Sequence, residues 1–242
     1  MPKPIGPEPL REITRGLPPA VPRSWLSLLL VAQAALLVNG RSLVGREFDT
    51  GIATFYLLFG FIPLILDDQL KRELLRGTVR EYVIKLVFGF LGTLVVFWLV
   101  FLEILQLPVG KIAYSSVLPM VVLQAMYVAP MEELFFRGYL TRLFDPKGRT
   151  WRLYASITLG QLLAAATFSG FHYAAYGSSS LAPFLITFAL AVAWTFLSRL
   201  EAGWPFHSQG RRPLGIPFTI GSHLAWNLCV LGILTGGVLL SD

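Results

Sequence analysis

Six polar residues in the second half of this 242-residue chain have the types and spacing needed for proton transfer: Glu132, Glu133, Arg137, His172, His223 and Asn227. Carboxylates and imidazoles can exchange protons with a bound water, and imidazole and amide N–H groups can stabilise a developing oxyanion. Each residue lies within or at the end of an apolar run, where a charged side chain costs roughly 2.5 to 3.5 kcal/mol on the insertion scale. Polar groups retained at that cost are candidates for function.

The stretch APMEELFFRGYL, residues 129–140, carries the two acids and the arginine. Glu133 and Arg137 are four residues apart with the acid first, the favourable order for an ion pair on one helix face. Glu132 is rotated by about 100° from Glu133 and has no partner in its own helix. We therefore predict that Glu132 is a functional carboxylate and that Glu133 and Arg137 support it electrostatically. The alternative is a buried ion-pair cluster that serves stability alone.

The remaining polar candidates lie on two other apolar runs. His172 ends one run in the string FSGFH, and His223 and Asn227 are four apart in SHLAWN, on one helix face and able to point at the same atom. A lone histidine in an apolar run is usually a packed core residue, but a carboxylate, two histidines and an amide together predict one polar site. His207 falls in an expected loop and Cys229 in an apolar helix, so neither is expected to take part in chemistry.

The elements that must position these residues are apolar segments. The chain is 55% hydrophobic and its mean hydropathy is +0.64, more apolar than an ordinary soluble domain. Seven apolar segments can be marked, with ends good to a few residues: 25–40, 51–66, 86–107, 115–143, 153–173, 181–198 and 214–240. Continuous runs of this kind favour helices over the alternating strands of a membrane barrel. We predict an all-α, polytopic membrane bundle of about seven, between six and eight, transmembrane helices.

The basic residues predict the orientation of this bundle. Sixteen of the 20 Lys and Arg fall in the N-terminal tail and in alternate gaps, whereas three fall in the gaps on the other side. The N-terminus is therefore expected in the cytoplasm and the C-terminus outside. Residues 1–23 hold seven of the 16 prolines and predict a disordered cytoplasmic tail, followed by one transmembrane domain over 24–242. The charge of +6 is expected to meet lipid headgroups, not nucleic acid.

Three motifs resemble those of the CAAX protease and bacteriocin-processing family of membrane proteins, also called the Abi family. Its motifs EExxxR, FxxxH and HxxxN occur here in the family's order as Glu132-Glu133-xxx-Arg137, Phe168-xxx-His172 and His223-xxx-Asn227. The resemblance covers about residues 115–240. It implies a multi-pass intramembrane endopeptidase related to the type II CAAX prenyl endopeptidases, which would lie in the plasma membrane if the source is a prokaryote. The implied partners are membrane lipids and a peptide or protein substrate, lipidated or not.

Peptide hydrolysis needs an activated water, a donor for the oxyanion and a proton for the leaving amine. We assign Glu132 as the base, with His172 holding the water or sharing its proton. His223 and Asn227 are assigned as oxyanion donors. This metal-free version, with no cofactor, is favoured, but a zinc site of Glu132, His172 and His223 stays open. The sequence is also compatible with a non-catalytic membrane immunity or scaffold protein and with a proton-coupled transporter.

Overall fold

The computed structural model describes residues 25–75, 78–99, 114–145, 152–154, 157–176, 181–203, 205–206 and 212–239. Its helices before the central run are α1 (Trp25–Leu43), α2 (Thr50–Leu66), α3 (Asp68–Leu75) and α4 (Val79–Phe97). The central run comprises α5 (Tyr114–Leu123), the π-helix η2 (Gln124–Val128), α6 (Ala129–Glu132), the π-helix η3 (Glu133–Leu140) and α7 (Thr141–Phe144). After it come α8 (Leu159–Tyr176), α9 (Ala182–Ser198) and α10 (Ile216–Leu239).

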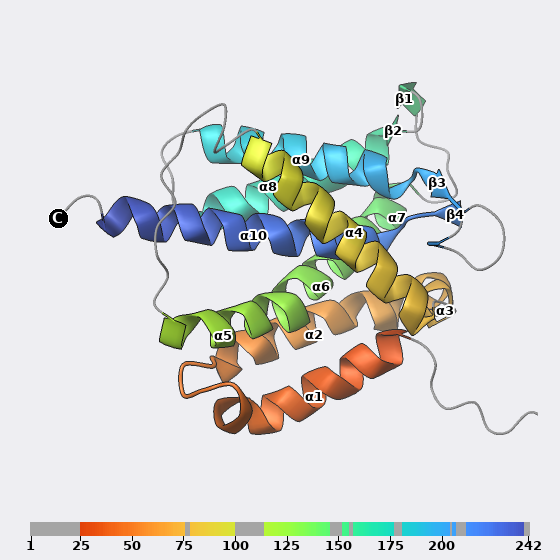
Figure 1. Ribbon diagram of the computed structural model, residues 1–242. Helices are drawn as coiled ribbons and strands as arrows, with labels where there is room; N and C mark the ends of the chain where they lie inside the picture. The colour runs from red at the N-terminus through yellow and green to blue at the C-terminus, as the bar shows by residue number, and fades with distance from the viewer. Residues whose placement is uncertain are drawn as a thin grey trace, which may run out of the picture.

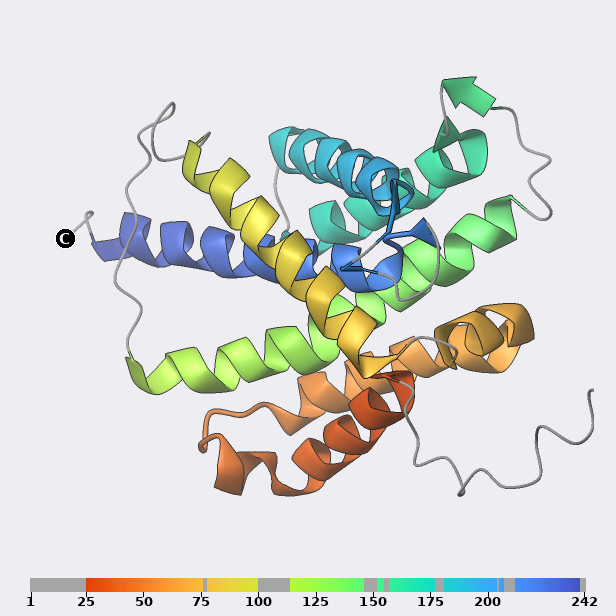
Figure 2. The same cartoon turned by 45° about the vertical axis from the view of Figure 1, so that its right-hand side comes forward.

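The helices lie around the central run from α5 to α7 (Figure 1). On one side of it lie α1 and α2, and on the other lie α8, α9 and α10, an arrangement that the second view repeats (Figure 2). The helix α4 crosses α10, and these two helices form the most extensive helix pair of the described chain. Two antiparallel hairpins, β1 (Arg152–Tyr154) with β2 (Ile157–Thr158) and β3 (Glu201–Ala202) with β4 (Arg212–Pro213), connect helices at one end.

Local signals explain where several helices begin. Asp49 caps α2 by accepting a hydrogen bond from the Ile52 amide at 2.9 Å, and Thr78 caps α4 by accepting from Glu81 at 3.3 Å. At the end of α2 the chain bends by 106° into α3. There the Asp67 carboxylate accepts a hydrogen bond from the Leu70 amide at 2.8 Å, which satisfies a donor in the first turn of α3.

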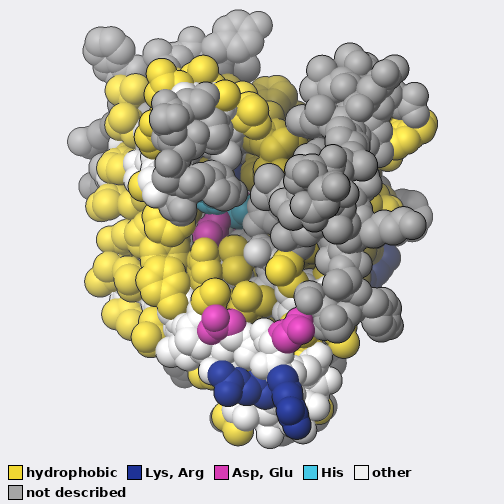
Figure 3. Space-filling model, turned by 90° about the vertical axis from the view of Figure 1, so that its left-hand side faces the viewer, with side chains coloured by type: hydrophobic (Ala, Val, Ile, Leu, Met, Phe, Trp, Pro, Cys, Tyr) yellow, Lys and Arg dark blue, Asp and Glu magenta, His cyan; other side chains and the backbone are white. Residues whose placement is uncertain are grey.

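The expectation of a mostly helical membrane protein is confirmed. By length and composition Trp25–Leu43 and Val117–Phe144 can each cross a membrane, and the bent pair Thr50–Leu66 with Asp68–Leu75 makes a third candidate if counted as one span. Hydrophobic side chains cover much of the described part of the face in Figure 3. Val38, Leu58 and Ile65 are exposed by 82%, 62% and 72%, as lipid contact requires. The count of seven spans and the orientation stay predictions.

Helix boundaries differ from the sequence expectation in three places. The fifth apolar segment was expected to begin at 153, but β1 and β2 occupy its first residues and α8 begins at Leu159. The third begins earlier than expected, at Val79, and α3 was not foreseen because five of its eight residues are polar. The tail 1–23 and residues 100–107 of the third segment lie outside the described residues.

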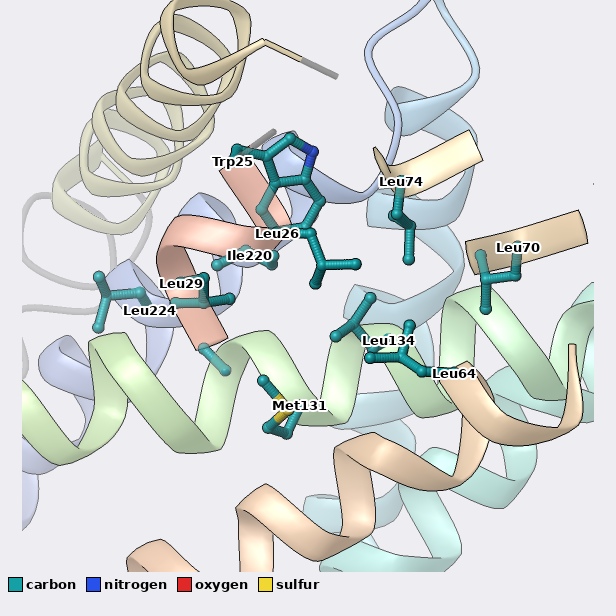
Figure 4. Packing of buried hydrophobic residues seen from close by; sticks show 11 residues of the cluster. Trp25, Leu26, Leu29, Leu64, Leu70, Leu74, Met131, Leu134, Ile220 and Leu224 are labelled. Atoms are coloured by element: carbon teal, nitrogen blue, oxygen red, sulfur yellow. The ribbon is translucent and has the colours of Figure 1, made fainter. Parts of the chain in front are cut away.

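The main apolar core joins the first helices to the central run and α10. Its large buried side chains include Trp25, Leu29, Leu64, Leu134 and Ile220, which interlock beside η3 (Figure 4). Nearer the start of the run, α1 is tied to η2 by two side-chain bonds: Gln33 donates to the Met126 carbonyl, and Tyr127 donates to the Gln33 carbonyl. These contacts hold the central run in register with α1.

Glycine allows α4 and α10 to approach closely. A Cβ atom at Gly89 would lie 2.1 Å from the Phe218 carbonyl oxygen, and one at Gly221 would lie 1.9 Å from that of Leu86. The Ser222 hydroxyl donates to the Gly89 carbonyl at 3.2 Å across the same contact. Because the obstructing atoms are backbone, the helices would have to separate to admit a side chain.

We expect Gly89→Ala to destabilise the fold by about 1 to 3 kcal/mol, the usual cost of overpacking a close contact. Gly92→Ala, three residues along the same helix, is the matched control, because a Cβ there has nothing within 4 Å. Alanine at that open site should leave stability unchanged or raise it slightly, since glycine is the poorer helix former. Thermal unfolding in detergent measures both, and equal melting temperatures for the two variants would refute the close contact.

Candidate active site

The Glu132 carboxylate lies at the centre of the polar cluster. The residue is 1% exposed, and its Oε1 accepts a hydrogen bond of 2.9 Å from the Tyr56 hydroxyl on α2. Its Oε2 lies 3.6 Å from His172 Nε2 and 3.5 Å from His223 Nε2. The predicted meeting of one carboxylate with two histidines is therefore present, at distances that one bridging water spans.

Glu133 has different partners from its neighbour. Its Oε1 accepts from Arg137 Nη1 within the same helical run and from His223 Nδ1 at 2.8 Å. The Arg137 guanidinium also packs on two aromatic rings, 4.6 Å from the centre of Phe168 and 5.2 Å from that of Trp194. The predicted ion pair between Glu133 and Arg137 is present as a contact, with the Arg137 side chain 8% exposed and that of Glu133 fully buried.

The two imidazoles turn the same nitrogen towards Glu132. His172 Nδ1 lies 3.0 Å from the Phe168 carbonyl and His223 Nδ1 lies 2.8 Å from the Glu133 carboxylate, so in each ring Nδ1–H is the donor. In the neutral rings both Nε2 atoms then carry lone pairs that face Glu132 Oε2. Glu132 Oε2 and the two Nε2 atoms are all hydrogen-bond acceptors. Such a group favours a hydrogen-bond donor or a cation between its members, such as a water or a metal ion.

The cluster has the donor types of a zinc site, and two of its three ligand separations match the spacing of one. One ligand atom each from Glu132, His172 and His223 lies within 4.8 Å of the others. A tetrahedral zinc with ligands at 2.0 to 2.2 Å separates them by about 3.4 Å, close to the 3.5 and 3.6 Å found here. Both Nδ1 atoms are also held by oxygen partners, as metal-bound histidines usually are.

Asn227 lies one turn beyond His223 on α10 and on the same side of the helix. Its Nδ2 donates to Gln124 Oε1 on η2 at 2.9 Å. The two residues line a small pocket together with His172, Trp194 and Trp226. Because an amide nitrogen carries two hydrogens, the bond to Gln124 leaves Asn227 a second donor for an oxyanion.

The fold explains the depth of His172. Counted from Arg152 along an uninterrupted helix, it would lie about 30 Å into the membrane. Because α8 begins at Leu159, His172 is 13 residues into it, or about 20 Å at 1.5 Å per residue. The β1–β2 hairpin thus takes up the excess length. Glu132 in turn lies between the π-helical turns of η2 and η3, a winding that is frequent at functional sites.

Three residues of the cluster were not foreseen. No sequence pattern marks Tyr56 as a site residue, because it lies 76 residues before Glu132, in an otherwise apolar run. Trp194 packs against the His223 ring at 5.5 Å and has the sequence context of ordinary packing. Gln124 could have been found as a polar amide in an apolar segment eight residues before Glu132.

The described chain is thus a helical membrane protein with acid, base and amide groups gathered among apolar helices. Residues 114–229, just under half of the chain, match the family model of the Rce1-like, type II CAAX prenyl endopeptidase family. This match runs from the first residue of α5 into α10 and contains all six predicted site residues. The resemblance inferred from the three motifs is confirmed over this segment, and it is to a family of proteases. Searches of curated proteins and of solved structures found no match.

Removal of one member of the buried Glu133–Arg137 ion pair should lower the stability of the fold. We expect Arg137→Gln to destabilise the fold by about 3 to 5 kcal/mol, because it leaves Glu133 without its cation. The double variant Glu133→Gln/Arg137→Gln should recover part of that loss, since no lone charge remains. Thermal unfolding of the two single variants and the double variant in detergent measures the coupling.

Arg142→Gln is the control for loss of an arginine. Arg142 pairs with Glu73 at a side-chain exposure of 30%, where an ion pair contributes about 0 to 1 kcal/mol. A loss for Arg137→Gln no larger than that of Arg142→Gln would contradict a structural role for the buried pair.

Proposed function

We propose that this protein is an intramembrane endopeptidase in which Glu132 activates the water that attacks the peptide bond. The observation that carries the proposal is the convergence of Glu132 Oε2 with the Nε2 atoms of His172 and His223 in a buried site. A base and two imidazoles at water-bridging distance supply the groups that amide hydrolysis needs. The match of residues 114–229 to a protease family supports the same reaction.

In the proposed reaction a water held by Glu132 and His172 attacks the carbonyl carbon while Glu132 takes its proton. A C–O bond forms and the carbonyl electrons move to the oxygen, which accepts hydrogen bonds from Asn227 and His223. Donation from His223 Nε2 requires the doubly protonated ring, because Nδ1–H is already bonded to Glu133. The C–N bond then breaks, and the proton held by Glu132 passes to the leaving amine.

Glu133 and Arg137 act in this scheme as positioning residues. Glu133 holds the His223 ring through Nδ1, and Arg137 neutralises Glu133. A zinc-dependent version of the same protease is the second candidate, favoured by the ligand spacing alone. In that version Glu132, His172 and His223 would hold the ion, which would lower the pKa of its bound water.

The proposed setting is a multi-pass membrane protein with about seven spans and a cytoplasmic N-terminus, in the plasma membrane if the source is a prokaryote. The proposed substrate is a peptide segment at the membrane, lipidated or not, and lipids surround the apolar exterior. The alternation of basic and non-basic gaps supports the orientation.

Glu132→Gln should lower kcat for peptide cleavage by at least 100-fold, because general-base catalysis contributes about 10² to 10⁴. Purified protein and a fluorogenic peptide library, with lipidated and unlipidated members, provide the assay. Glu73→Gln is the control, since it makes the same change on a half-exposed side chain of α3. Cleavage that persists in Glu132→Gln would rule out that residue as the base.

Metal content measured on the same sample distinguishes the two versions. One zinc per chain together with loss of cleavage in chelator, restored by zinc, would favour the metal site. Chelator-resistant cleavage without bound metal would favour the glutamate-activated water.

Tyr56→Phe should lower kcat roughly tenfold while KM stays near its original value. The change removes the hydrogen bond to Glu132 Oε1 and keeps the ring, and bonds to charged groups contribute about 1.5 to 3 kcal/mol. Tyr139→Phe, the same change on η3, is the control. If the two variants have the same kcat, or if Tyr56→Phe changes KM instead, Tyr56 does not position the base.

A further inference from the structure

The helix α9 contributes none of the residues of the three motifs, yet it forms one wall of the site. It lies beside α8 and also contacts α10 (Figure 1). Its buried residues Thr187, Ala191 and Trp194 are three and four apart and so share one face, whereas Leu185 and Ile186 are exposed by 59% and 47%. This buried face brings Trp194 to the polar cluster, where it lines the same small pocket as both site histidines.

The Trp194 ring stacks on the His223 imidazole. The ring centres are 5.5 Å apart, the planes are inclined by 30°, and Trp194 is 4% exposed. Phe168 makes a T-shaped contact with the same imidazole, also with the ring centres 5.5 Å apart. The bond from Nδ1 to Glu133 fixes one atom of the imidazole, but the direction of Nε2 also depends on what contacts the ring face. The stacked indole therefore limits how far the imidazole can turn about that bond.

The same indole contacts the Arg137 guanidinium. The central carbon of this group lies 5.2 Å from the ring centre of Trp194 and 4.6 Å from that of Phe168. Arg137 Nε and Nη2 have no hydrogen-bond acceptor among the described residues, although the side chain is only 8% exposed. The electron-rich faces of the two rings stabilise a cation that is buried with so few hydrogen bonds.

Arg137 and His223 are the two groups that bond to Oε1 of Glu133. We propose that Trp194 is a positioning residue for the reaction: it holds the His223 ring so that Nε2 faces Glu132, and it holds Arg137 beside Glu133. The effect on catalysis rests on the proposed protease function, whereas the hold on the two side chains does not. The metal-free and zinc versions both need His223 Nε2 at this position, so the role is the same in each.

Kinetics of Trp194 variants test the effect on the reaction. Trp194→Leu should lower kcat for peptide cleavage by about 10- to 100-fold while KM stays near its original value, because a displaced catalytic group slows the chemical step without removing substrate contacts. Trp194→Phe keeps an aromatic face for both partners and should retain kcat within about threefold. Unchanged kcat in Trp194→Leu, or a change in KM alone, would overturn the inference.

Trp25→Leu is the matched control. Trp25 is 3% exposed and stacks on Tyr82 with the ring centres 4.5 Å apart, so it loses a comparable contact in the main apolar core. Its replacement should lower the melting temperature, as that of Trp194 does, and leave kcat of the folded protein unchanged. An equal fall in kcat for Trp25→Leu and Trp194→Leu would show a general loss of packing and contradict a positioning role.

Nitrogen-15 NMR of histidine-labelled protein in detergent measures the His223 ring without an activity assay. The chain has three histidines, so His172→Gln and His207→Gln assign the remaining signals to His223. The hydrogen on His223 Nδ1 should give a sharp signal, because its bond to Glu133 slows exchange with solvent. That signal should persist in Trp194→Phe and Trp25→Leu and should broaden or disappear in Trp194→Leu.

The NMR and kinetic results separate the positioning role from the protease function. If the wild-type protein cleaves no member of the peptide library, the protease function fails, and the His223 signal still decides whether Trp194 holds the ring. If the wild-type protein cleaves peptides and the His223 signal is sharp and unshifted in Trp194→Leu, the protease function stands and the inference is wrong.

Discussion

Burial of two adjacent carboxylates among apolar helices is the constraint that organises this structure. Both Glu132 and Glu133 are at most 1% exposed, and a buried charge without partners costs several kcal/mol. Their partners come from three separate places: Tyr56 on α2, Arg137 on the same run and His223 on α10. These elements must therefore meet at hydrogen-bond distance, and α2 and α10 both pack directly against α6 and η3.

His223 connects the two acids, because each ring nitrogen faces a different carboxylate. Its bond to Glu133 orients the ring, and the ring in turn places Nε2 beside Glu132. Glu133 is held by a cation and an imidazole on one oxygen, whereas Glu132 turns one oxygen towards two histidines. Two neighbouring residues of the same type thus have different partners, because they occupy different helix faces, and in the proposed reaction they have separate tasks.

Much of the site was predictable from sequence because it depends on local spacing. The Glu133–Arg137 pair follows from an i, i+4 interval, and the gathering of Glu132, His172 and His223 follows from the cost of isolated polar groups in apolar runs. Tyr56 and Trp194 were not predictable, because a tyrosine or tryptophan in an apolar segment has the same appearance whether it contacts a carboxylate or a neighbouring helix. The late start of α8 depends on the short β1–β2 hairpin, whose strands are too brief for a periodic pattern.

The hydrogen bond from Tyr56 to Glu132 links α2 to the central run, so these two parts of the chain depend on each other. The donor lies outside the segment 114–229 that matches the protease family, yet it reaches the carboxylate at the heart of that segment. The matched segment therefore does not contain every residue that contacts Glu132. Exchange of residues 114–229 between relatives would separate Glu132 from the α2 surface that it contacts. A functional chimera would have to carry α2 and the central run from the same parent.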